Sequence, residues 1–580
     1  MRLTELTIKN YRSFDDQGQT VTFTTNHTAL VGKNNSGKSN LFNALNIVLG
    51  DKVPNYAKFS EDDYWDISKP IEIQVTLGDI KQTDKSLLFN LPSITKAQQG
   101  ALNASIPNGS AKVTLLLRKN FGLDNEEATS EETQDTFDIN LWGFNVFRKK
   151  EETRKILIKL LLIPAVRDSQ DILSATSWTP YGQLMKEVLE SSPSYAEIKR
   201  DLESINNKIQ IVFDTEKTKL VEQSKIVSYV DDISFRLTKS NNPSELLRNL
   251  IIFVREGSKE FDIEHVGTGT QNAVILGILE LALKSKNCTA RIFCIEEPEA
   301  FIHPHGIRYL GSLIKNVSSK DNIQVIFSTH SVALTANFEP NEIVRICKED
   351  GKTVIKQNSS FSSTHYKRFI HPGNADIFFS DRIVLVEGAT EKILLNNLDK
   401  ITYSSESDSS LRNCNLDRKN VGVIAMDSVD SIMNYIEIAK GFDIPYIAIT
   451  DKDLVESPHK EGKLKSLCSF LGITYQKNDI PKLVNDLRNN SIIVNTKGEI
   501  EDVFDDKDIE IISGVSVATI KSLKAKHPNK TSKAFIEIFN CGKPEYALKI
   551  ADHYEQNKSK HPLEDTIRKI YSNDSANISL

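Results

Sequence analysis

This sequence lacks several features, and each absence excludes a class of protein. No two of its six cysteines have Cys-x-x-Cys spacing, so a zinc or redox motif of that kind is not expected. No apolar run reaches the length of a membrane-spanning helix. The charged start of the chain is followed by no apolar segment of the signal-peptide kind. We therefore expect a cytoplasmic protein.

An excess of positive charge is also missing. The chain has 72 Lys and Arg against 78 Asp and Glu, a net charge of −6. Such a protein has no overall basic field to attract nucleic acid. Any contact with DNA must come from a local patch or from bound metal ions. The length of 580 residues suggests about two to four domains.

Short apolar and alternating segments predict α/β architecture with two sheets. Strands are expected at residues 3–8, 28–31, 71–77, 111–117, 291–295 and 324–327, and an apolar helix at 271–283. Later strands at 383–386, 421–425 and 446–449, separated by helical stretches, predict a second, parallel sheet. Three other segments have distinct patterns: an acidic exposed loop at 124–138, a mainly helical insertion at 151–249, and a Lys-rich, exposed helical tail at 521–560. We find no internal repeat.

A phosphate-binding loop follows the expected strand at 28–31. Its sequence GKNNSGKS fits G-x-x-x-x-G-K-[ST], and a helix is expected after it. Glycines let backbone N–H groups approach phosphates, and the helix N-terminus adds a positive dipole end. Lys38 would contact the β- and γ-phosphates of ATP, and the Ser39 hydroxyl would bind Mg²⁺. A chance Gly- and Ser-rich turn is the alternative. The predicted ATP site contains Gly32, Lys33, Asn34, Asn35, Ser36, Gly37, Lys38 and Ser39.

Two adjacent acids, Glu296 and Glu297, end the apolar strand expected at 291–295. The carboxyl end of such a strand is the usual place for one acid that binds Mg²⁺ and a second that activates the attacking water. We assign the metal role to Glu296 and the general-base role to Glu297. The common version of this pattern has Asp in the first position, and a solvated acidic loop is the alternative.

Two further segments resemble motifs of ABC ATPases. Residues 267–271, GTGTQ, are similar to the ABC signature at a helix start. In that family this helix start binds the γ-phosphate held by the other protomer, so the resemblance implies a homodimer with Gly269 and Gln271 at the ATP. His330, after the strand at 324–327, resembles the ABC switch histidine, although a structural histidine is the alternative. The early stretch 9–14, KNYRSF, resembles the start of SMC- and RecF-like ATPases, which act on DNA.

A second set of acids predicts a metal site in the second sheet. Glu387 follows one apolar strand, and Asp451 and Asp453 follow another. Residues two apart in an extended segment point the same way, so these aspartates can converge on one cation with Glu387 on the same rim. Hard oxygen ligands select Mg²⁺ or Mn²⁺, and Glu391 adds a carboxylate for a second ion. Two metals can support phosphodiester hydrolysis. The pattern resembles that of Toprim domains, and an ordinary surface turn is the alternative.

An ABC-type ATPase domain at 1–345 followed by a Toprim domain at 346–580 resembles the OLD (overcoming lysogenization defect) family of nucleases. The layout is nearest to the nucleases of the Gabija antiphage system. The resemblance implies metal-dependent nicking or cutting of DNA, coupled to ATP through a dimer formed by the helical insertion. It also implies further acids and a lysine near the end of the Toprim domain. Glu501 and Lys543 are our choices, and Glu499 and Asp502 remain open for the acid.

The family resemblance also bears on partners. DNA and a second copy of the chain are expected, and a UvrD-like helicase follows if this is a Gabija nuclease, whereas a stand-alone OLD nuclease has none. Two other functions remain open. One is an SMC- or RecF-like ATP-driven DNA clamp with a non-catalytic Toprim domain, and the other is a regulatory NTPase that scaffolds a toxic effector.

Overall fold

The computed structural model divides the chain into two compact units, Met1–Thr28 with Ser39–Thr329 and Ala29–Lys38 with His330–Leu580. No helix among the described residues is both long and apolar enough to cross a membrane. The described residues are 1–92, 94–121, 135–165, 180–212, 252–256, 258–267, 269–271, 274, 277, 288–300, 302, 304–320, 323–358, 369–404, 415–426, 428–528, 530–557 and 560–572.

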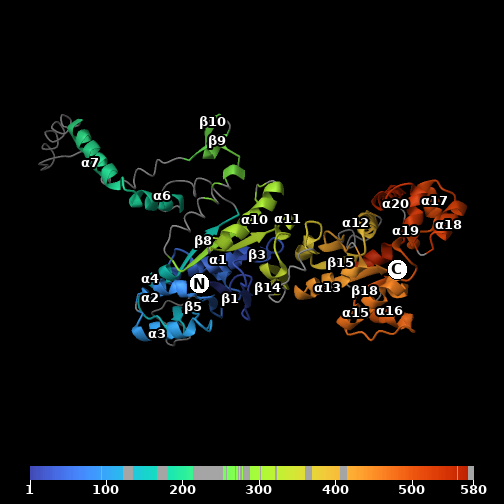
Figure 1. Cartoon of the computed structure of the whole chain (residues 1–580), viewed down its shortest axis with the longest axis horizontal. Coiled ribbons are helices and arrows are strands. Elements are labelled where there is room, and N and C mark those ends of the chain that lie inside the picture. The colour runs from blue at the N-terminus through green and yellow to red at the C-terminus, as the bar shows by residue number, and fades with distance from the viewer. Residues whose placement is uncertain are drawn as a thin grey trace. The chain divides into compact units, whose positions relative to one another are not determined.

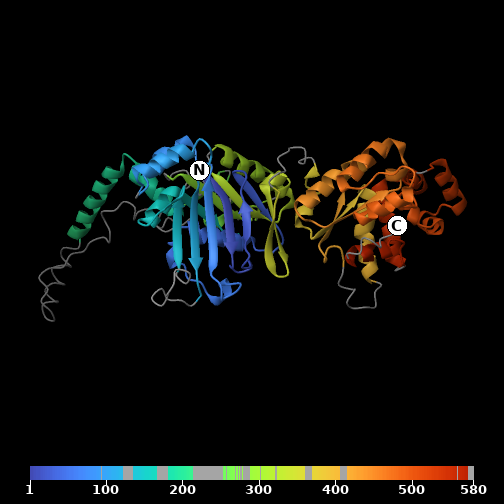
Figure 2. The same ribbon diagram turned by 90° about the horizontal axis from the view of Figure 1, so that it is seen from below.

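The first sheet is antiparallel and has six strands in the order β2-β1-β4-β5-β6-β7. Figure 2 shows its blue strands side by side. Alternate residues of β5 are buried, as expected where one face of a sheet packs on a core. The strands are β1 (Arg2–Lys9), β2 (Gln19–Thr22), β4 (Ile71–Gly78), β5 (Val113–Lys119), β6 (Thr136–Leu141) and β7 (Phe144–Asn145), with helices α2 (Lys85–Phe89) and α3 (Lys96–Ser105) between β4 and β5.

One expectation about this sheet is wrong. The acidic loop expected at 124–138 ends inside a strand, because Thr136–Leu141 forms β6 and pairs with β5. Residues 124–134 of that loop lie outside the described part of the chain. The alternation of Phe137, Ile139 and Leu141, all buried, is the strand signal that the acidic composition concealed.

The second sheet has the order β14-β13-β3-β12-β11-β8. Its strands β8, β11 and β12 are parallel neighbours, and every residue of β12 is buried, which is typical of a strand covered on both faces. The strands are β3 (His27–Val31), β8 (Ile158–Ile163), β11 (Ala290–Glu296), β12 (Gln324–Thr329), β13 (Ile343–Glu349) and β14 (Lys352–Lys356), and the helices are α1 (Lys38–Leu49), α10 (Pro304–Lys320) and α11 (Val332–Thr335).

Two boundaries differ from those expected for this domain. The segment Ile158–Ile163, assigned to a helical insertion at 151–249, forms β8 and pairs with β11. That pairing joins residues more than a hundred positions apart, so no local pattern predicts it. The strand β13 pairs with β3, and β14 pairs with β13, so the sheet extends beyond residue 345. We therefore propose a domain boundary after Lys356.

The remaining described part of the insertion is helical and ends in a hairpin. It contains α4 (Lys150–Leu157), α6 (Pro180–Ser191) and α7 (Tyr195–Val212), followed by strands β9 (Phe253–Glu256) and β10 (Lys259–Asp262). The rest of the insertion, and most of the helix expected at 271–283, lie outside the described residues. The role of the insertion in dimerisation stays a prediction.

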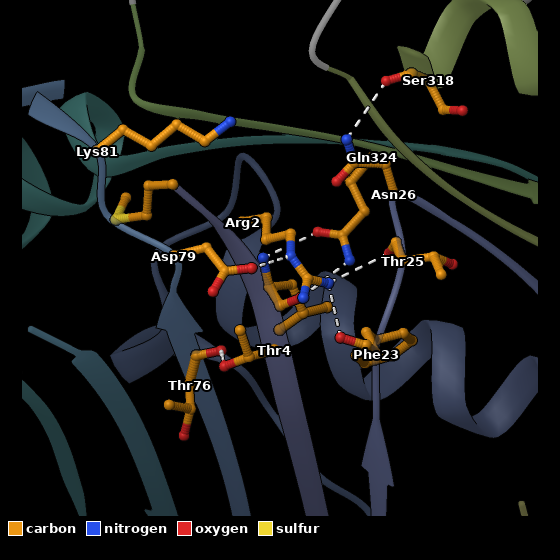
Figure 3. Close-up of polar contacts among 12 residues, drawn as sticks. Arg2, Thr4, Phe23, Thr25, Asn26, Thr76, Asp79, Lys81, Ser318 and Gln324 are labelled. Carbon is orange, nitrogen blue, oxygen red and sulfur yellow. Dashed lines mark hydrogen bonds and ion pairs between the residues drawn. The ribbon is translucent and has the colours of Figure 1, made fainter. Parts of the chain in front are cut away.

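A polar network fixes the first strand to the core of the ATPase domain (Figure 3). The side-chain amide of Gln324 accepts from the Leu3 N–H at 2.8 Å and donates to the Leu3 carbonyl at 2.9 Å. Arg2 donates to the carbonyls of Phe23 at 2.6 Å and Thr25 at 3.2 Å and pairs with Asp79. The β1 backbone therefore hydrogen-bonds to a side chain of β12, which holds the antiparallel sheet against that strand.

The third sheet is parallel and has four strands in the order β16-β15-β17-β18. The three strands expected here are confirmed, and β18, on the edge, was not anticipated. Figure 1 shows α12 on one side of this sheet and α13, α15 and α16 on the other. The elements are β15 (Arg382–Val386), α12 (Ala389–Ser404), β16 (Val421–Ala425), α13 (Ile432–Gly441), β17 (Tyr446–Asp451), α14 (Asp453–Glu456), α15 (Glu461–Leu471), α16 (Ile480–Asn489) and β18 (Ile492–Asn495).

The Lys-rich tail is helical, as expected, but the expectation that it is exposed is wrong. Phe535 and Tyr546 are fully buried in one core with residues of α12 and the sheet. Each such side chain contributes about 1.5–3 kcal/mol through burial. Of the lysines on these helices, Lys521, Lys526 and Lys533 are exposed, whereas Lys524 is half-buried. The helices are α17 (Asp506–Ser513), α18 (Val517–Lys526), α19 (Thr531–Phe539), α20 (Lys543–Asn557) and α21 (Glu564–Ser572).

Candidate nucleotide site and candidate metal centre

The phosphate loop has a backbone that requires glycine at two positions. Gly32 has φ +154° and Gly37 has φ +111°. A Cβ atom at Gly32 would lie 2.0 Å from the carbonyl oxygen of Ile346, and one at Gly37 would lie 2.3 Å from Oγ1 of Thr353. Asn35 is left-handed at φ +61°, a conformation that asparagine tolerates. The two glycines of the G-x-x-x-x-G-K-S sequence therefore lie at positions where the backbone conformation and the close neighbours exclude other residues. This specific arrangement favours a phosphate loop over a chance Gly-rich turn.

Lys38 is the first residue of α1, and its side chain folds back over the loop. Its buried ammonium group donates to the carbonyls of Gly32 at 2.9 Å and Lys33 at 2.7 Å. Ser39 follows it in the first turn of the helix. This places a positive charge and a helix N-terminus at the loop, the two features that bind the phosphates of a nucleotide.

The acids predicted to serve ATP hydrolysis lie at the end of β11. Glu296 is opposite Ser328 of β12, and its Oε2 accepts from the N–H of Ala165 at 3.2 Å. Glu297 has a left-handed backbone at φ +44°, and its N–H donates to the Ser328 carbonyl at 3.0 Å. Such a conformation costs on the order of 1–3 kcal/mol outside glycine and often marks a functional position.

A third acid of this segment was not anticipated. Oε1 of Glu299 accepts a hydrogen bond of 2.6 Å from the Thr329 hydroxyl, at the end of β12. His330 follows Thr329 directly, between β12 and α11. The strands β11 and β12 are parallel neighbours, so their carboxyl ends lie at the same edge of the sheet. Glu296, Glu297 and Glu299 lie at the end of β11, and His330 follows the end of β12.

The segment that resembles the ABC signature is partly described. The Gln271 side-chain amide donates to three carbonyls of the preceding turn, those of Ile263 at 3.0 Å, Glu264 at 3.3 Å and Val266 at 3.1 Å. Thr268 lies outside the described residues. Gln271 therefore stabilises the turn within its own chain, and the contact of Gly269 and Gln271 with a partner's nucleotide stays a prediction.

The acids of the predicted metal centre lie at the carboxyl ends of two neighbouring parallel strands. Glu387 follows β15, and Asp451 is the last residue of β17, with Val386 and Ile449 in register. Asp453 begins α14. Glu391 lies in the first turn of α12, where its Oε2 accepts from the N–H of Gly388 at 3.0 Å. The topology therefore places Glu387, Asp451 and Asp453 at one edge of the sheet.

Burial and mutual repulsion make these carboxylates costly to ionise. Burial, then the charges of Glu387 and Glu391, raise the pKa of Asp451 to about 9. Burial also raises the pKa of Glu387 and that of Glu391, and it raises the pKa of Glu501 to about 7. A cluster of acids with raised pKa values at a strand end is typical of a site that binds cations.

The candidates for the further Toprim acid, which follow β18 in the sequence, have different surroundings. Glu501 is buried and accepts a hydrogen bond from the Tyr546 hydroxyl, and its charge contributes to the raised pKa of Asp451. Asp502 instead accepts from the Thr531 hydroxyl at 2.6 Å and from the N–H of Glu499 at 2.9 Å. Both oxygens of Asp502 thus accept hydrogen bonds from neighbouring groups. As the further acid of the metal centre, Glu501 is therefore favoured over Asp502.

Two lysines lie at opposite ends of the acid cluster. Lys543, the first residue of α20, is close enough for its charge to lower the pKa of Glu391, against the larger effect of burial. Lys460, which sequence reasoning missed, is hydrogen-bonded to Asp453 and lies 3.6 Å from Glu387. Nothing in the sequence around Lys460 distinguishes it from the other lysines of this chain.

The donor chemistry of the cluster fits a divalent cation. Oε2 of Glu387 is buried and has no hydrogen-bond partner among the described residues, so an oxygen is available for a metal. Within the described part of the chain, no three acidic, His or Cys side chains are already gathered at ligand spacing. Like charges repel, so carboxylates of this kind close up only around a cation. Glu387, Glu391, Asp451, Asp453 and Glu501 are the side chains that would hold Mg²⁺ or Mn²⁺.

Comparison with known protein families assigns different domains to the two parts of the chain that contain these sites. Residues 1–335 match the model of the AAA ATPase domain, and residues 378–453 match the model described as overcoming lysogenization defect protein-like, TOPRIM domain. The chain belongs to the AAA ATPase domain family and carries an OLD-like Toprim domain. The expected α/β fold class, with an ATPase domain before a Toprim domain, is confirmed.

Curated relatives share most of the length. The Old nuclease of Escherichia phage P2 is 23% identical over 86% of this chain and 84% of its own. The OLD nuclease of Thermus scotoductus is 24% identical over 78% of this chain and 82% of its own. The endonuclease GajA of Bacillus cereus is 23% identical over 80% of this chain and 77% of its own. The expected resemblance to OLD nucleases and to GajA endonucleases is thus confirmed over most of the chain.

Proposed function

We propose that this protein is a metal-dependent DNA endonuclease whose ATPase domain regulates cleavage. The observation that carries the proposal is the pair of half-buried carboxylates at the ends of β15 and β17, Glu387 and Asp451. Burial and neighbouring charges raise the pKa of Asp451, and one oxygen of Glu387 is buried without a described partner. Relatives named as nucleases align with both domains, which supports DNA as the substrate.

The residues divide the chemistry among them. A divalent ion bound here supplies an activated water and neutralises charge on the phosphate. Glu387, Asp451 and Asp453 would hold that ion from two segments of the chain, together with Glu391 and Glu501. Lys543, at the start of α20, is placed to offset negative charge as the phosphodiester is cleaved. None of these roles requires ATP, because phosphodiester hydrolysis is downhill.

ATP therefore acts as a regulator in this proposal. The phosphate loop binds the nucleotide, Glu296 serves its Mg²⁺, Glu297 activates water, and Gly269, Gln271 and His330 sense the γ-phosphate within a homodimer. A role in antiphage defence, and a UvrD-like helicase partner, extend the proposal by family likeness to the GajA relative.

Nicking of supercoiled plasmid tests the proposal. The purified protein is incubated with plasmid DNA in Mg²⁺ or Mn²⁺, with EDTA as the control, and open-circular and linear products are measured on a gel. We expect metal-dependent product that EDTA abolishes. Intact plasmid under every metal and nucleotide condition, together with ATP-dependent DNA binding, would instead establish the rival SMC- or RecF-like clamp.

The Glu297→Gln variant tests the assignment of the general base. Glutamine keeps the shape of the side chain but cannot accept the proton, so ATP turnover should fall by about 10²–10⁴-fold while ATP still binds. Phosphate release and calorimetry measure the two quantities. Glu260→Gln, an exposed acid of the hairpin, is the matched control. Turnover at the wild-type rate would reassign the base, with Glu296 next in line.

A further inference from the structure

We propose that Lys460 has two roles at the metal centre, first as the counter-ion of its carboxylates and then as a contact for the DNA phosphate. Its ammonium group neutralises Asp453 and Glu387 in the metal-free protein, and a divalent ion displaces it from Asp453. The released ammonium then binds the DNA phosphate. The inference rests on the proposed nuclease function, since it concerns the same carboxylates, but its first half concerns metal binding alone.

The hydrogen bonds of Lys460 carry the inference. Its Nζ lies 2.7 Å from Oδ1 and 2.7 Å from Oδ2 of Asp453, and 3.6 Å from Oε1 of Glu387. Both carboxylate oxygens of Asp453 are therefore occupied by one cationic group. A divalent ion that takes Asp453 as a ligand binds one of these oxygens within a few ångströms of the ammonium group. The two positive charges repel each other there, so the ion and the ammonium compete.

The backbone holds Lys460 in this place. Asp453 begins α14, the N–H of Ser457 bonds back to the Asp453 carbonyl at 3.0 Å, and the N–H of Lys460 bonds to the Ser457 carbonyl at 3.0 Å. Pro458 opens this turn, and proline restricts φ. The backbone turns between Asp453 and Lys460, so that two residues seven positions apart are in contact. The flexible side chain of Lys460 therefore stays beside the metal centre after it leaves Asp453.

The distribution of charge explains why a lysine is needed at this end of the cluster. Lys543 acts on Glu391, and Lys460 acts on Glu387 and Asp453. Asp451 lies among the acids with its pKa raised by burial and by their charges. The two lysines thus offset part of the negative charge of the carboxylates in the metal-free protein, and the charge on Asp453 and Glu387 is the part that an incoming metal ion takes over from Lys460.

Replacement of Lys460 should therefore change two quantities in opposite directions. In Lys460→Met the metal no longer competes with a charge-assisted hydrogen bond, so we expect Mn²⁺ to bind about tenfold more tightly. At saturating Mn²⁺ the kcat for plasmid nicking should fall about tenfold, because the cation that would contact the phosphate is gone. A residue needed only for folding would weaken both.

The experiment uses the full-length protein. Mn²⁺ affinity is measured by isothermal titration calorimetry without DNA, and kcat is measured by plasmid nicking at saturating Mn²⁺. Lys460→Gln is studied beside Lys460→Met, so that the comparison survives if the apolar substitution does not fold. Lys460→Arg keeps the cation and should restore most of both values. Lys463→Met is the matched control, since Lys463 is exposed and pairs with Asp430.

The outcomes separate this inference from the proposed function. Tighter Mn²⁺ binding with a lower kcat supports it. Unchanged or weaker binding in both Lys460→Met and Lys460→Gln overturns it. If the wild type binds Mn²⁺ but nicks no DNA, the nuclease function fails, while tighter binding in the variants still supports displacement of the ammonium by the ion.

Discussion

Alanine in place of Glu387 or Asp451 is expected to abolish plasmid nicking in Mg²⁺ or Mn²⁺ and to leave ATP hydrolysis nearly intact. These two acids end neighbouring parallel strands of the Toprim sheet, whereas the phosphate loop follows a strand of another sheet. Loss of residues that merely support metal ligands lowers activity by about 10–100-fold, so loss of a ligand should cost at least about a hundredfold. Gel-based nicking and phosphate release measure the two activities on the same preparations.

Asp430→Ala is the control for this prediction. Asp430 is an exposed acid of the same domain, and its carboxylate pairs with Lys463. It should nick DNA like the wild type. Undiminished nicking by the Asp451 variant would show that the carboxylates do not form the nuclease centre, and the clamp function would then be preferred.

The reverse result is expected for Lys38→Ala, which should lose ATP binding and hydrolysis but retain some nicking. Lys38 donates two hydrogen bonds inside the phosphate loop, and alanine leaves no cation for the phosphates. A charge-assisted hydrogen bond contributes about 1.5–3 kcal/mol, so ATP affinity should fall by about 10- to 150-fold. Isothermal titration calorimetry with ATP measures the change.

Lys96→Ala is the matched control for this second prediction, because Lys96 is an exposed residue at the start of α3. Wild-type ATP affinity in the Lys38 variant would mean that the phosphate loop is misassigned. Complete loss of nicking together with ATP binding would contradict the expectation that cleavage proceeds without nucleotide, and it would make ATP an obligatory activator.

Sequence reasoning predicted the local structure correctly where a motif lies within one strand, one turn and one helix. The phosphate loop is of this kind, because the positive φ angles of Gly32 and Gly37 and the helix that begins at Lys38 belong to one continuous segment. Glu387 after β15 and Asp451 at the end of β17 are similar, since an acid directly after an apolar strand is recognisable without knowledge of the partner strand. The order of an ATPase domain and a Toprim domain, and the resemblance to OLD nucleases, followed from these segments.

Sequence reasoning failed where a residue's role depends on distant contacts. The strand β8 reads as part of a helical region because its partner β11 is far along the chain. The Lys-rich helices look exposed because lysine dominates their composition, yet Phe535 and Tyr546 pack into the core. Composition records which residues are present, and it does not record which helix face meets another element.

The sequence by itself thus determined the two domains, the phosphate loop and the acids at the strand ends, because each depends on short-range backbone geometry. The tertiary structure alone decided three hydrogen bonds: Tyr546 donates to Glu501, Thr531 donates to Asp502, and Lys460 donates to Asp453. These contacts join turns and helices whose approach is fixed by packing, and packing is a property of the whole fold.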